Sequence, residues 1–141
     1  MKNNQNVAEN DIERARQVLK IESEGLELLA LSINHELSLA INILQRVDGR
    51  IIVTGMGKSG HVAKKIAATL SSTGKASFFI HPGEASHGDI GMISTNDAIL
   101  ALSNSGETPE LSDIIAYSRR FKIPLISMTS FIKSSLANES D

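Results

Sequence analysis

The stretch Ile-Ile-Val-Thr-Gly-Met-Gly-Lys-Ser-Gly, residues 51–60, decides the fold. Its first four residues form an unbroken β-branched run, which is typical of a short strand that is buried on both faces. Glycines then interrupt the strand, and apolar residues return at helical spacing from Val62 to about Leu70. The stretch therefore predicts a strand, a glycine loop (residues 55–60) and a helix, in that order.

The same alternation continues toward the C-terminus. Alternating strands and helices indicate a parallel sheet with right-handed crossovers. We therefore predict an α/β three-layer sandwich with a parallel sheet of at least four strands, in a flavodoxin-like arrangement. The glycine loop and residues 103–108 should meet at one edge of it. A polar stretch, 81–96, separates the second strand from the third, and residues 132–141 should add only a short helical turn. The further strands and the helix are predicted at residues 77–80, 98–102, 125–128 and about 109–121.

Upstream of the first strand the pattern predicts two helices. In the first, apolar residues recur mostly three, four or seven apart over residues 12–31, and Asp11 is in position to cap its N-terminus. Asn34 can cap the second helix, and Gly49 stands where a left-handed residue would end it. Residues 1–11 are polar and rich in asparagine, so we expect a flexible start.

The composition fits one domain over residues 1–141, because 41% of the residues are hydrophobic and 21% are charged. The formal net charge of -2 gives no field that would gather nucleic acid or an anionic membrane. The absence of cysteine excludes disulfides and thiolate chemistry. The N-terminal stretch has neither the apolar core of a signal peptide nor a membrane span. We expect a cytoplasmic protein without nucleic-acid or membrane partners.

Two nucleotide-binding motifs can be tested against the glycine loop. The loop satisfies Gly-x-Gly-x-x-Gly and contains a Gly-Lys-Ser triplet. The phosphate loop of nucleotide triphosphatases needs a glycine five residues before Gly57, where Ile52 stands. A dinucleotide-binding fold needs an acidic residue at the end of the second strand, but that strand ends at Ile80 and His81. Two interpretations remain: an anion held by backbone N–H groups at a helix N-terminus, or a tight turn without a ligand.

Residues 103–108, Ser-Asn-Ser-Gly-Glu-Thr, form a serine loop after the third predicted strand. Thr108 suits the N-cap of the next helix, Pro109 suits its first position, and Glu110 complements its dipole. The two serines and the asparagine at the start of the loop have no such structural use. They should face the same predicted edge as Lys58, and hydroxyls and loop N–H groups can surround a phosphate without adding charge. We therefore predict that the serine loop binds phosphate.

The Ser-x-Ser-Gly-x-Thr pattern after the third strand, with Gly-x-Gly-x-Ser after the first, resembles the SIS (sugar isomerase) domains of phosphosugar isomerases and phosphosugar-sensing regulators. His-Pro-Gly-Glu-Ala at 81–85 and His-Gly-Asp at 87–89 make the sequence similar in particular to the arabinose 5-phosphate isomerase family. The similarity extends from about Ile12 to the last residue. That family continues with a further SIS segment and, in many members, a pair of CBS modules. We therefore expect a single SIS domain that is incomplete at its C-terminus.

The resemblance implies an aldose-ketose isomerase that interconverts D-ribulose 5-phosphate and D-arabinose 5-phosphate for Kdo and lipopolysaccharide biosynthesis. Such a reaction moves a proton between C1 and C2 through an enediol, which needs a base and a donor for the developing oxyanion. By the same resemblance, Lys58 polarises the substrate oxygens, Glu110 transfers the proton and His87 lines the pocket. The implied binding residues are Gly57, Ser59, Ser103, Asn104, Ser105 and Thr108.

This chemistry needs no nucleotide, flavin or metal, so we expect no cofactor. Several zinc-binding residue types cluster between the second and third strands, but without the spacing of a metal site, and we expect no metal. They are His81, Glu84, His87 and Asp89.

The implied partner is a phosphorylated sugar. The apolar faces of the two leading helices and an incomplete sheet edge predict a homodimer or homotetramer. The alternative function is a catalytically impaired phosphosugar-binding module with a sensing or regulatory role. In the family, the further SIS segment supplies another glutamate and a histidine for the reaction, and the sequence after Ser135 does not contain that segment.

Overall fold

The computed structural model describes residues 2–141, with side chains from residue 10 onward. The chain divides into two compact units, one that ends at Leu39 and one that comprises Ala40–Asp141. Met1 lies outside the described residues. The predicted flexible start over residues 1–11, which includes Met1, stays a prediction.

The first helix, α1 (Lys2–Ser32), begins well before its predicted start. Asp11 therefore lies inside the helix and does not cap it, which corrects the sequence interpretation. The stretch 2–11 contains neither proline nor glycine, so nothing interrupts helical hydrogen bonding there. Asn34 caps α2 (His35–Arg46) as predicted, because its Oδ1 accepts a hydrogen bond from the N–H of Glu36 at 2.9 Å.

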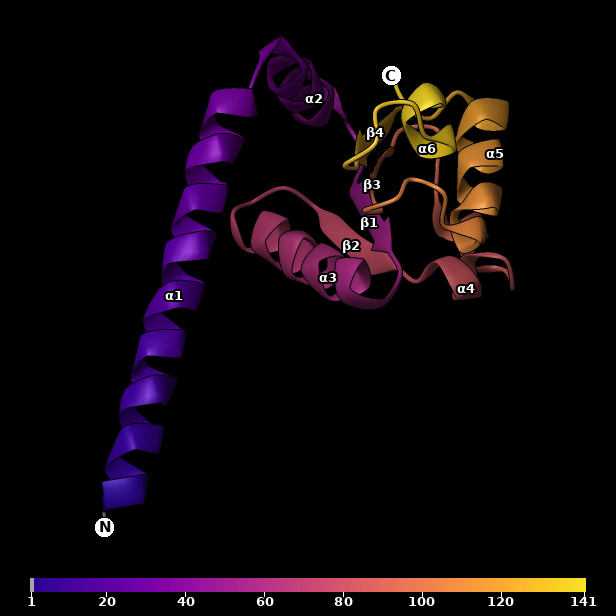
Figure 1. Cartoon of the computed structure of the whole chain (residues 1–141). Helices are drawn as coiled ribbons and strands as arrows, with labels where there is room; N and C mark the ends of the chain where they lie inside the picture. Colours follow the sequence, from indigo (N-terminus) through magenta and orange to yellow (C-terminus); the bar gives the residue numbers. More distant parts are fainter. Residues whose placement is uncertain (1) are drawn as a thin grey trace. The chain divides into compact units, whose positions relative to one another are not determined.

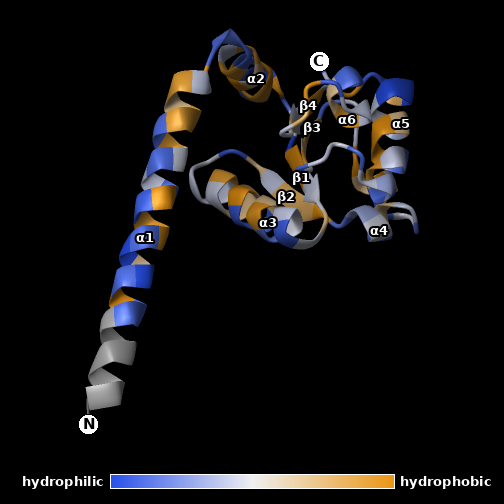
Figure 2. Ribbon diagram, viewed as in Figure 1, coloured by the Kyte–Doolittle hydropathy of each residue, from blue (hydrophilic) through white to orange (hydrophobic). Residues whose placement is uncertain are grey.

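The first unit exposes large apolar side chains along its length. Leu19 and Leu26 stand seven residues apart on one face of α1, and each is 66% exposed. Figure 2 shows hydrophobic bands alternating with hydrophilic ones along this helix. An apolar surface of this extent is typical of an interaction site. Its members between residues 10 and 39 are Ile12, Val18, Leu19, Ile21, Leu26, Leu28, Leu29, Leu31, Ile33, Leu37 and Leu39.

The second unit is built on a sheet of four parallel strands in the order β2-β1-β3-β4 (Figure 1). This is the flavodoxin-like order that the sequence predicts. The limits of β2, β3 and β4 agree with the predicted ones, and β1 is longer by one residue. The strands are β1 (Ile51–Gly55), β2 (Ser77–Ile80), β3 (Ala98–Leu102) and β4 (Leu125–Met128).

Helices cover both faces of the sheet, which confirms the three-layer sandwich (Figure 1). Successive strand residues point to opposite faces. Ile52 joins a core with Ile114 of α5 and Leu136 of α6, whereas Val53 packs with Ala63 of α3. Burial of a whole isoleucine, leucine or valine side chain stabilises the folded state by about 1.5–3 kcal/mol relative to leaving it exposed. The helices of this unit are α3 (Gly57–Ser72), α4 (Pro82–Ala85), η1 (Asp89–Met92), η2 (Pro109–Leu111), α5 (Ser112–Phe121) and α6 (Ser135–Asn138).

Glycine stands at position 49 for a different reason from the predicted one. The backbone of Gly49 does not adopt the left-handed conformation. Its N–H donates to the Asn96 carbonyl at 2.8 Å, and a Cβ at this position would collide with that carbonyl and with the Asp97 carboxylate. Glycine stands here because the backbone approaches another segment too closely for a side chain.

An ion pair joins the starts of β1 and β3. Arg50 Nη2 lies 2.9 Å from Asp97 Oδ2, and the carboxylate also accepts the N–H groups of Arg50 and Ser94. Asp97 is 1% exposed, whereas Arg50 is 41% exposed and lies over the Phe78 ring at 5.0 Å. Burial opposes the charge on Asp97, but these hydrogen bonds outweigh it and lower the pKa of the carboxyl group.

In two segments the secondary structure differs in detail from the prediction. The polar stretch 81–96 contains the short helices α4 and η1, and the helix predicted over 109–121 begins as the 3-10 helix η2 before α5. The short turn predicted within 132–141 is α6. Among residues 2–141 no helix is both long and apolar enough to cross a bilayer.

Candidate functional site

β1 and β3 place the glycine loop and the serine loop side by side. Gly55 pairs with Leu102 at the ends of these strands, and a Cβ on Gly55 would lie 2.8 Å from the Leu102 carbonyl oxygen. β2 lies on one side of β1 and β3 on the other, so the direction of strand order reverses here. Ligands of such sheets bind at this reversal, beyond the carboxyl ends of the strands. The prediction that the two loops meet at one edge is confirmed.

The glycine loop leads directly into α3, which begins at Gly57, inside the loop that was predicted over residues 55–60. Gly57 has a φ of 54°, a conformation that favours glycine. A Cβ on Gly60 would lie 2.6 Å from the Gly55 carbonyl oxygen, so the first helical turn packs closely on the strand end. Lys58 is exposed in this turn and Ser59 is half-buried. First-turn N–H groups have no intrahelical acceptor, which suits them to an anion.

The serine loop is closed by its own first residue. Ser103 is 3% exposed, and its N–H donates to the Met128 carbonyl at 3.1 Å. Its Oγ accepts the N–H of Gly106 at 3.0 Å and lies 2.8 Å from Thr108 Oγ1. Thr108 stands at the N-cap position of η2, but its side chain makes no capping bond, which corrects the predicted cap. Phosphate contact by either hydroxyl stays a prediction.

Asn104 and Ser105 are exposed at the tip of the serine loop. Asn104 Oδ1 accepts the hydroxyl of Ser130 at 2.9 Å, and Ser105 Oγ accepts the N–H of Glu107 at 3.2 Å. Within residues 10–141 neither the Asn104 amide nitrogen nor the Ser105 hydroxyl donates to another residue. Both groups can therefore donate to a bound anion.

The three predicted catalytic residues lie on segments that follow the ends of three neighbouring strands. Lys58 is in the first turn of α3 after β1, Glu110 is in η2 after β3, and His87 follows α4 after β2. All three side chains are exposed. In the part of the chain whose side chains are described, they form no hydrogen bond or ion pair with one another. The topology brings their segments to one edge of the sheet.

One neighbour of the serine loop was missed in the sequence. Residues 129–136 follow β4, and the N–H of Ser130 donates to the Asn104 carbonyl at 3.1 Å. A signal was present, because β4 lies beside β3 and a polar segment at its carboxyl end must face the same edge. Glu107, also missed, contacts this segment through the N–H of Ser135 at 2.7 Å.

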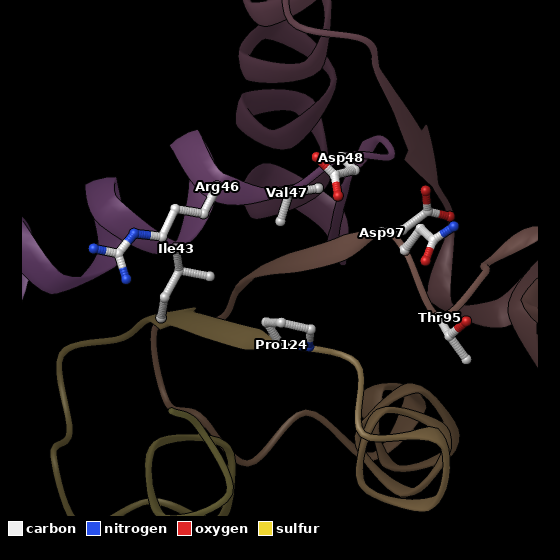
Figure 3. A pocket seen from close by; sticks show the side chains of 8 residues that line it. Ile43, Arg46, Val47, Asp48, Thr95, Asp97 and Pro124 are labelled. Atoms are coloured by element: carbon white, nitrogen blue, oxygen red, sulfur yellow. The ribbon is translucent and has the colours of Figure 1, made fainter.

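A pocket of about 350 Å³ lies at the opposite edge of the sheet (Figure 3). Its lining residues Asp48, Asp97 and Pro124 precede β1, β3 and β4, so they stand where the strands begin. The two loops stand where the strands end. We therefore place the candidate site at the loops and not in this pocket. From residue 10 to the C-terminus no three His, Asp or Glu side chains are grouped to hold a metal ion.

The profile of the SIS domain family matches residues 43–141, a stretch that contains both loops and the segment between them. The chain belongs to the SIS domain family. The resemblance inferred from the two loops is confirmed.

The chain is also similar to arabinose 5-phosphate isomerases of several bacteria. The arabinose 5-phosphate isomerase KdsD of Yersinia pestis is 51% identical over 126 residues, which are 89% of this chain and 38% of that protein. KdsD of Salmonella typhi is 47% identical over the same shares of the two chains. The structure of the E. coli CFT073 protein c3406 in complex with arabinose 5-phosphate has a TM-score of 0.88 at 38% identity, covering 92% of this chain and 69% of that one. The SIS chain thus spans 38% of the length of these curated relatives.

Proposed function

We propose that this SIS domain interconverts D-ribulose 5-phosphate and D-arabinose 5-phosphate. The observation that carries the proposal is the pairing of Gly55 with Leu102, which sets the glycine loop beside the serine loop at the reversal of strand order. The similarity to KdsD proteins and to a structure that holds arabinose 5-phosphate supports the choice of sugar. The proposed setting is the supply of arabinose 5-phosphate for Kdo and lipopolysaccharide synthesis in the cytoplasm.

The two loops would hold the phosphate end of the substrate. Asn104 and Ser105 offer free donors at the tip of the serine loop, and Gly57 and Ser59 offer backbone N–H groups at the start of α3. The side chains of Ser103 and Thr108 hold the serine loop in its conformation. We assign both to the phosphate-binding residues because they shape the loop that would bind the phosphate. These donors are neutral, so they can bind a phosphate without adding positive charge, which agrees with the net charge of -2.

The sugar end would then extend over the residues that do the chemistry. Lys58 would stabilise the oxyanion that develops on the substrate oxygens. Glu110 would carry the proton between C1 and C2. His87 would line the pocket from the segment between β2 and β3.

One observation favours the second candidate function, a phosphosugar-binding module with a regulatory role. Lys58, Glu110 and His87 are exposed, and no hydrogen bond among residues 10–141 orients their side chains. Catalytic groups act with full effect only when they are held in place. Binding through the preformed serine loop does not depend on this alignment.

We also propose that the chain forms a homodimer or homotetramer through α1. The exposed leucines and isoleucines of α1 are the support for this proposal. Burying such a surface against a second copy would remove it from water.

A deuterium-exchange assay separates the two functions. An isomerase that works through an enediol removes the C2 proton of arabinose 5-phosphate and incorporates solvent deuterium at C1 of the ribulose 5-phosphate that it forms. We expect both signals by NMR with the full chain. Calorimetric binding without either signal would support the binding module instead. Absence of both binding and turnover would refute both functions.

A further inference from the structure

Backbone contacts fasten the middle of the serine loop to residues 129–136. Asn104 contributes its carbonyl, which accepts the hydroxyl of Thr129 at 3.2 Å, and Gly106 contributes its carbonyl, which accepts the N–H of Leu136 at 3.1 Å. Gly106 has a φ of 67°, and a Cβ on it would collide with the Ser134 side chain. The loop and the segment after β4 therefore fit together without space for a side chain between them.

The carboxylate of Glu107 completes this attachment. Its Oε1 accepts the N–H of Ser135 at 2.7 Å. Ser135 is the first residue of α6, after the N-cap Ser134, so its N–H has no acceptor within the helix. Hydrogen bonding from Ser135 lowers the pKa of Glu107, which keeps the carboxylate ionised and able to accept.

Glu107 stands between the residues that would meet the phosphate. Its own N–H donates to Ser105 Oγ, and the next residue, Thr108, bonds to Ser103. A hollow of about 360 Å³ borders the same place and is lined by Ser105, Glu107, Phe131, Lys133 and Ser134.

We propose that Glu107 is a positioning residue, whose carboxylate holds α6 and thereby fixes the serine loop in the orientation that receives the phosphate of the substrate. This inference rests on the proposed function. Glu107 does not touch the reacting carbons; it acts through Ser105 and Asn104. An exposed hydrogen bond adds little to global stability, so its loss weakens ligand binding more than folding. It also leaves Lys58 and Glu110 in place, so KM rises while kcat changes little.

The test compares Glu107→Ala with Glu107→Gln, since glutamine keeps an oxygen acceptor on a side chain of the same length. Calorimetric titration of the full chain with arabinose 5-phosphate should show affinity about tenfold weaker in Glu107→Ala and recovered to within about threefold in Glu107→Gln. The matched control is Glu139→Ala, because Glu139 is an exposed glutamate that pairs with Arg119 instead. Equal affinity of Glu107→Ala and the unmutated chain would overturn the proposal.

A second variant removes the other half of the bond. Ser135→Pro deletes the donor N–H at the first position of α6, where proline is tolerated, and Ser134 already has the extended ψ of 160° that suits the residue before proline. Ser135→Ala keeps the N–H and is its reference. If the two groups act through one bond, Glu107→Ala adds nothing to the loss in Ser135→Pro. Additive losses would overturn the shared bond.

Amide hydrogen exchange tests the positioning role without any ligand. Glu107→Ala should speed exchange at the N–H groups of Ser130 and Leu136 by about fivefold, and Glu107→Gln should not. Unchanged exchange would overturn the role of Glu107. Failure of the unmutated chain to bind any sugar phosphate would instead refute the proposed function, so the two failures are distinguishable.

Discussion

The hydroxyl oxygens of Ser103 and Thr108 lie 2.8 Å apart across the serine loop. The Ser103 oxygen also accepts the N–H of Gly106, so one buried atom holds the turn at two points. A loop that is already closed loses little conformational entropy when a ligand arrives. The bond therefore prepares Asn104 and Ser105, at the tip, for an anion.

Removal of this hydroxyl should loosen the fold. Ser103→Ala leaves the Thr108 hydroxyl without its partner and leaves the Gly106 N–H only its bond to the Ser103 carbonyl at 3.2 Å. The expected cost is about 1 kcal/mol or more in the free energy of unfolding. Urea denaturation measures it. The control is Ser112→Ala, which removes an exposed hydroxyl and should cost less than about 0.5 kcal/mol. Similar losses in the two variants would contradict the role assigned to Ser103.

The glycine loop should not tolerate a methyl group at its tightest point. Gly60→Ala would set a Cβ 2.6 Å from the Gly55 carbonyl oxygen, and the strain should cost about 1–3 kcal/mol. Thermal unfolding with calorimetry gives the value. At Gly91 a Cβ meets no atom within 4 Å, so Gly91→Ala is the matched control. A Gly60→Ala variant as stable as the control would show that the strand end moves aside easily.

The Arg50–Asp97 pair predicts a contribution to stability that acid removes. The pKa of Asp97 in the folded chain is below its ordinary value of 3.8, which the unfolded chain retains. A lowered folded pKa contributes stability that is present above the ordinary value and is lost as the pH falls through the folded value. Stability should therefore decline below about pH 4.

The measurement is urea denaturation at a series of pH values in Asp97→Asn. This variant should be less stable at neutral pH and should decline less in acid than the unmutated chain. Asp113→Asn replaces an exposed carboxylate and is the control, with the full acid decline retained. An unchanged acid profile in Asp97→Asn would exclude Asp97 as the source.

The strand limits could be predicted because each strand is a short, mainly apolar run with polar, glycine or proline residues at its ends. The start of α1 could not, since a polar stretch without glycine or proline is compatible with both helix and coil. Gly49 was misassigned for another reason. Glycine is required there because the carbonyl of Asn96 lies too close for a side chain, and no local sequence pattern reveals a neighbour in space.

For the candidate site, the position of the loops was predictable, but their internal hydrogen bonds were not. The two loops could be located because they contain glycines and hydroxyls at the ends of parallel strands. The inward direction of Ser103 and the bond from Thr108 back to it could not, because N-cap statistics do not include a competing partner within the same loop. The contact of Glu107 with Ser135 joins residues 28 apart in sequence, so it depends on the packing of α6.

Self-association through α1 can be tested on one face of the helix. Leu19→Glu combined with Leu26→Glu keeps helix propensity but places two charges on the exposed apolar face. Loss of two leucines that the proposed assembly would bury should weaken association by about 3 kcal/mol or more. Sedimentation at micromolar concentration should then show a shift toward monomer. Gln17→Glu adds the same side chain at a polar position and should leave the assembly unchanged. A monomeric unmutated chain would refute the assembly itself.

Ser105 and Lys58 should separate binding from chemistry. Ser105→Ala removes a hydroxyl that is free to donate to phosphate, and loss of a hydrogen bond to a charged group costs about 1.5–3 kcal/mol, which is roughly ten- to a hundredfold in affinity. Lys58→Ala removes the charge that would stabilise the oxyanion, so turnover should fall by about a hundredfold or more while affinity changes little.

Calorimetry with arabinose 5-phosphate and the isomerisation rate together decide between these roles. Lys65→Ala, which removes an exposed lysine farther along α3, is the control for charge and should change neither quantity. Unchanged affinity in Ser105→Ala would refute direct phosphate contact at the tip of the serine loop. A Lys58→Ala variant that loses affinity and kcat/KM by the same factor, with kcat unchanged, would place Lys58 on the phosphate, because an interaction made equally in the ground state and the transition state does not alter kcat.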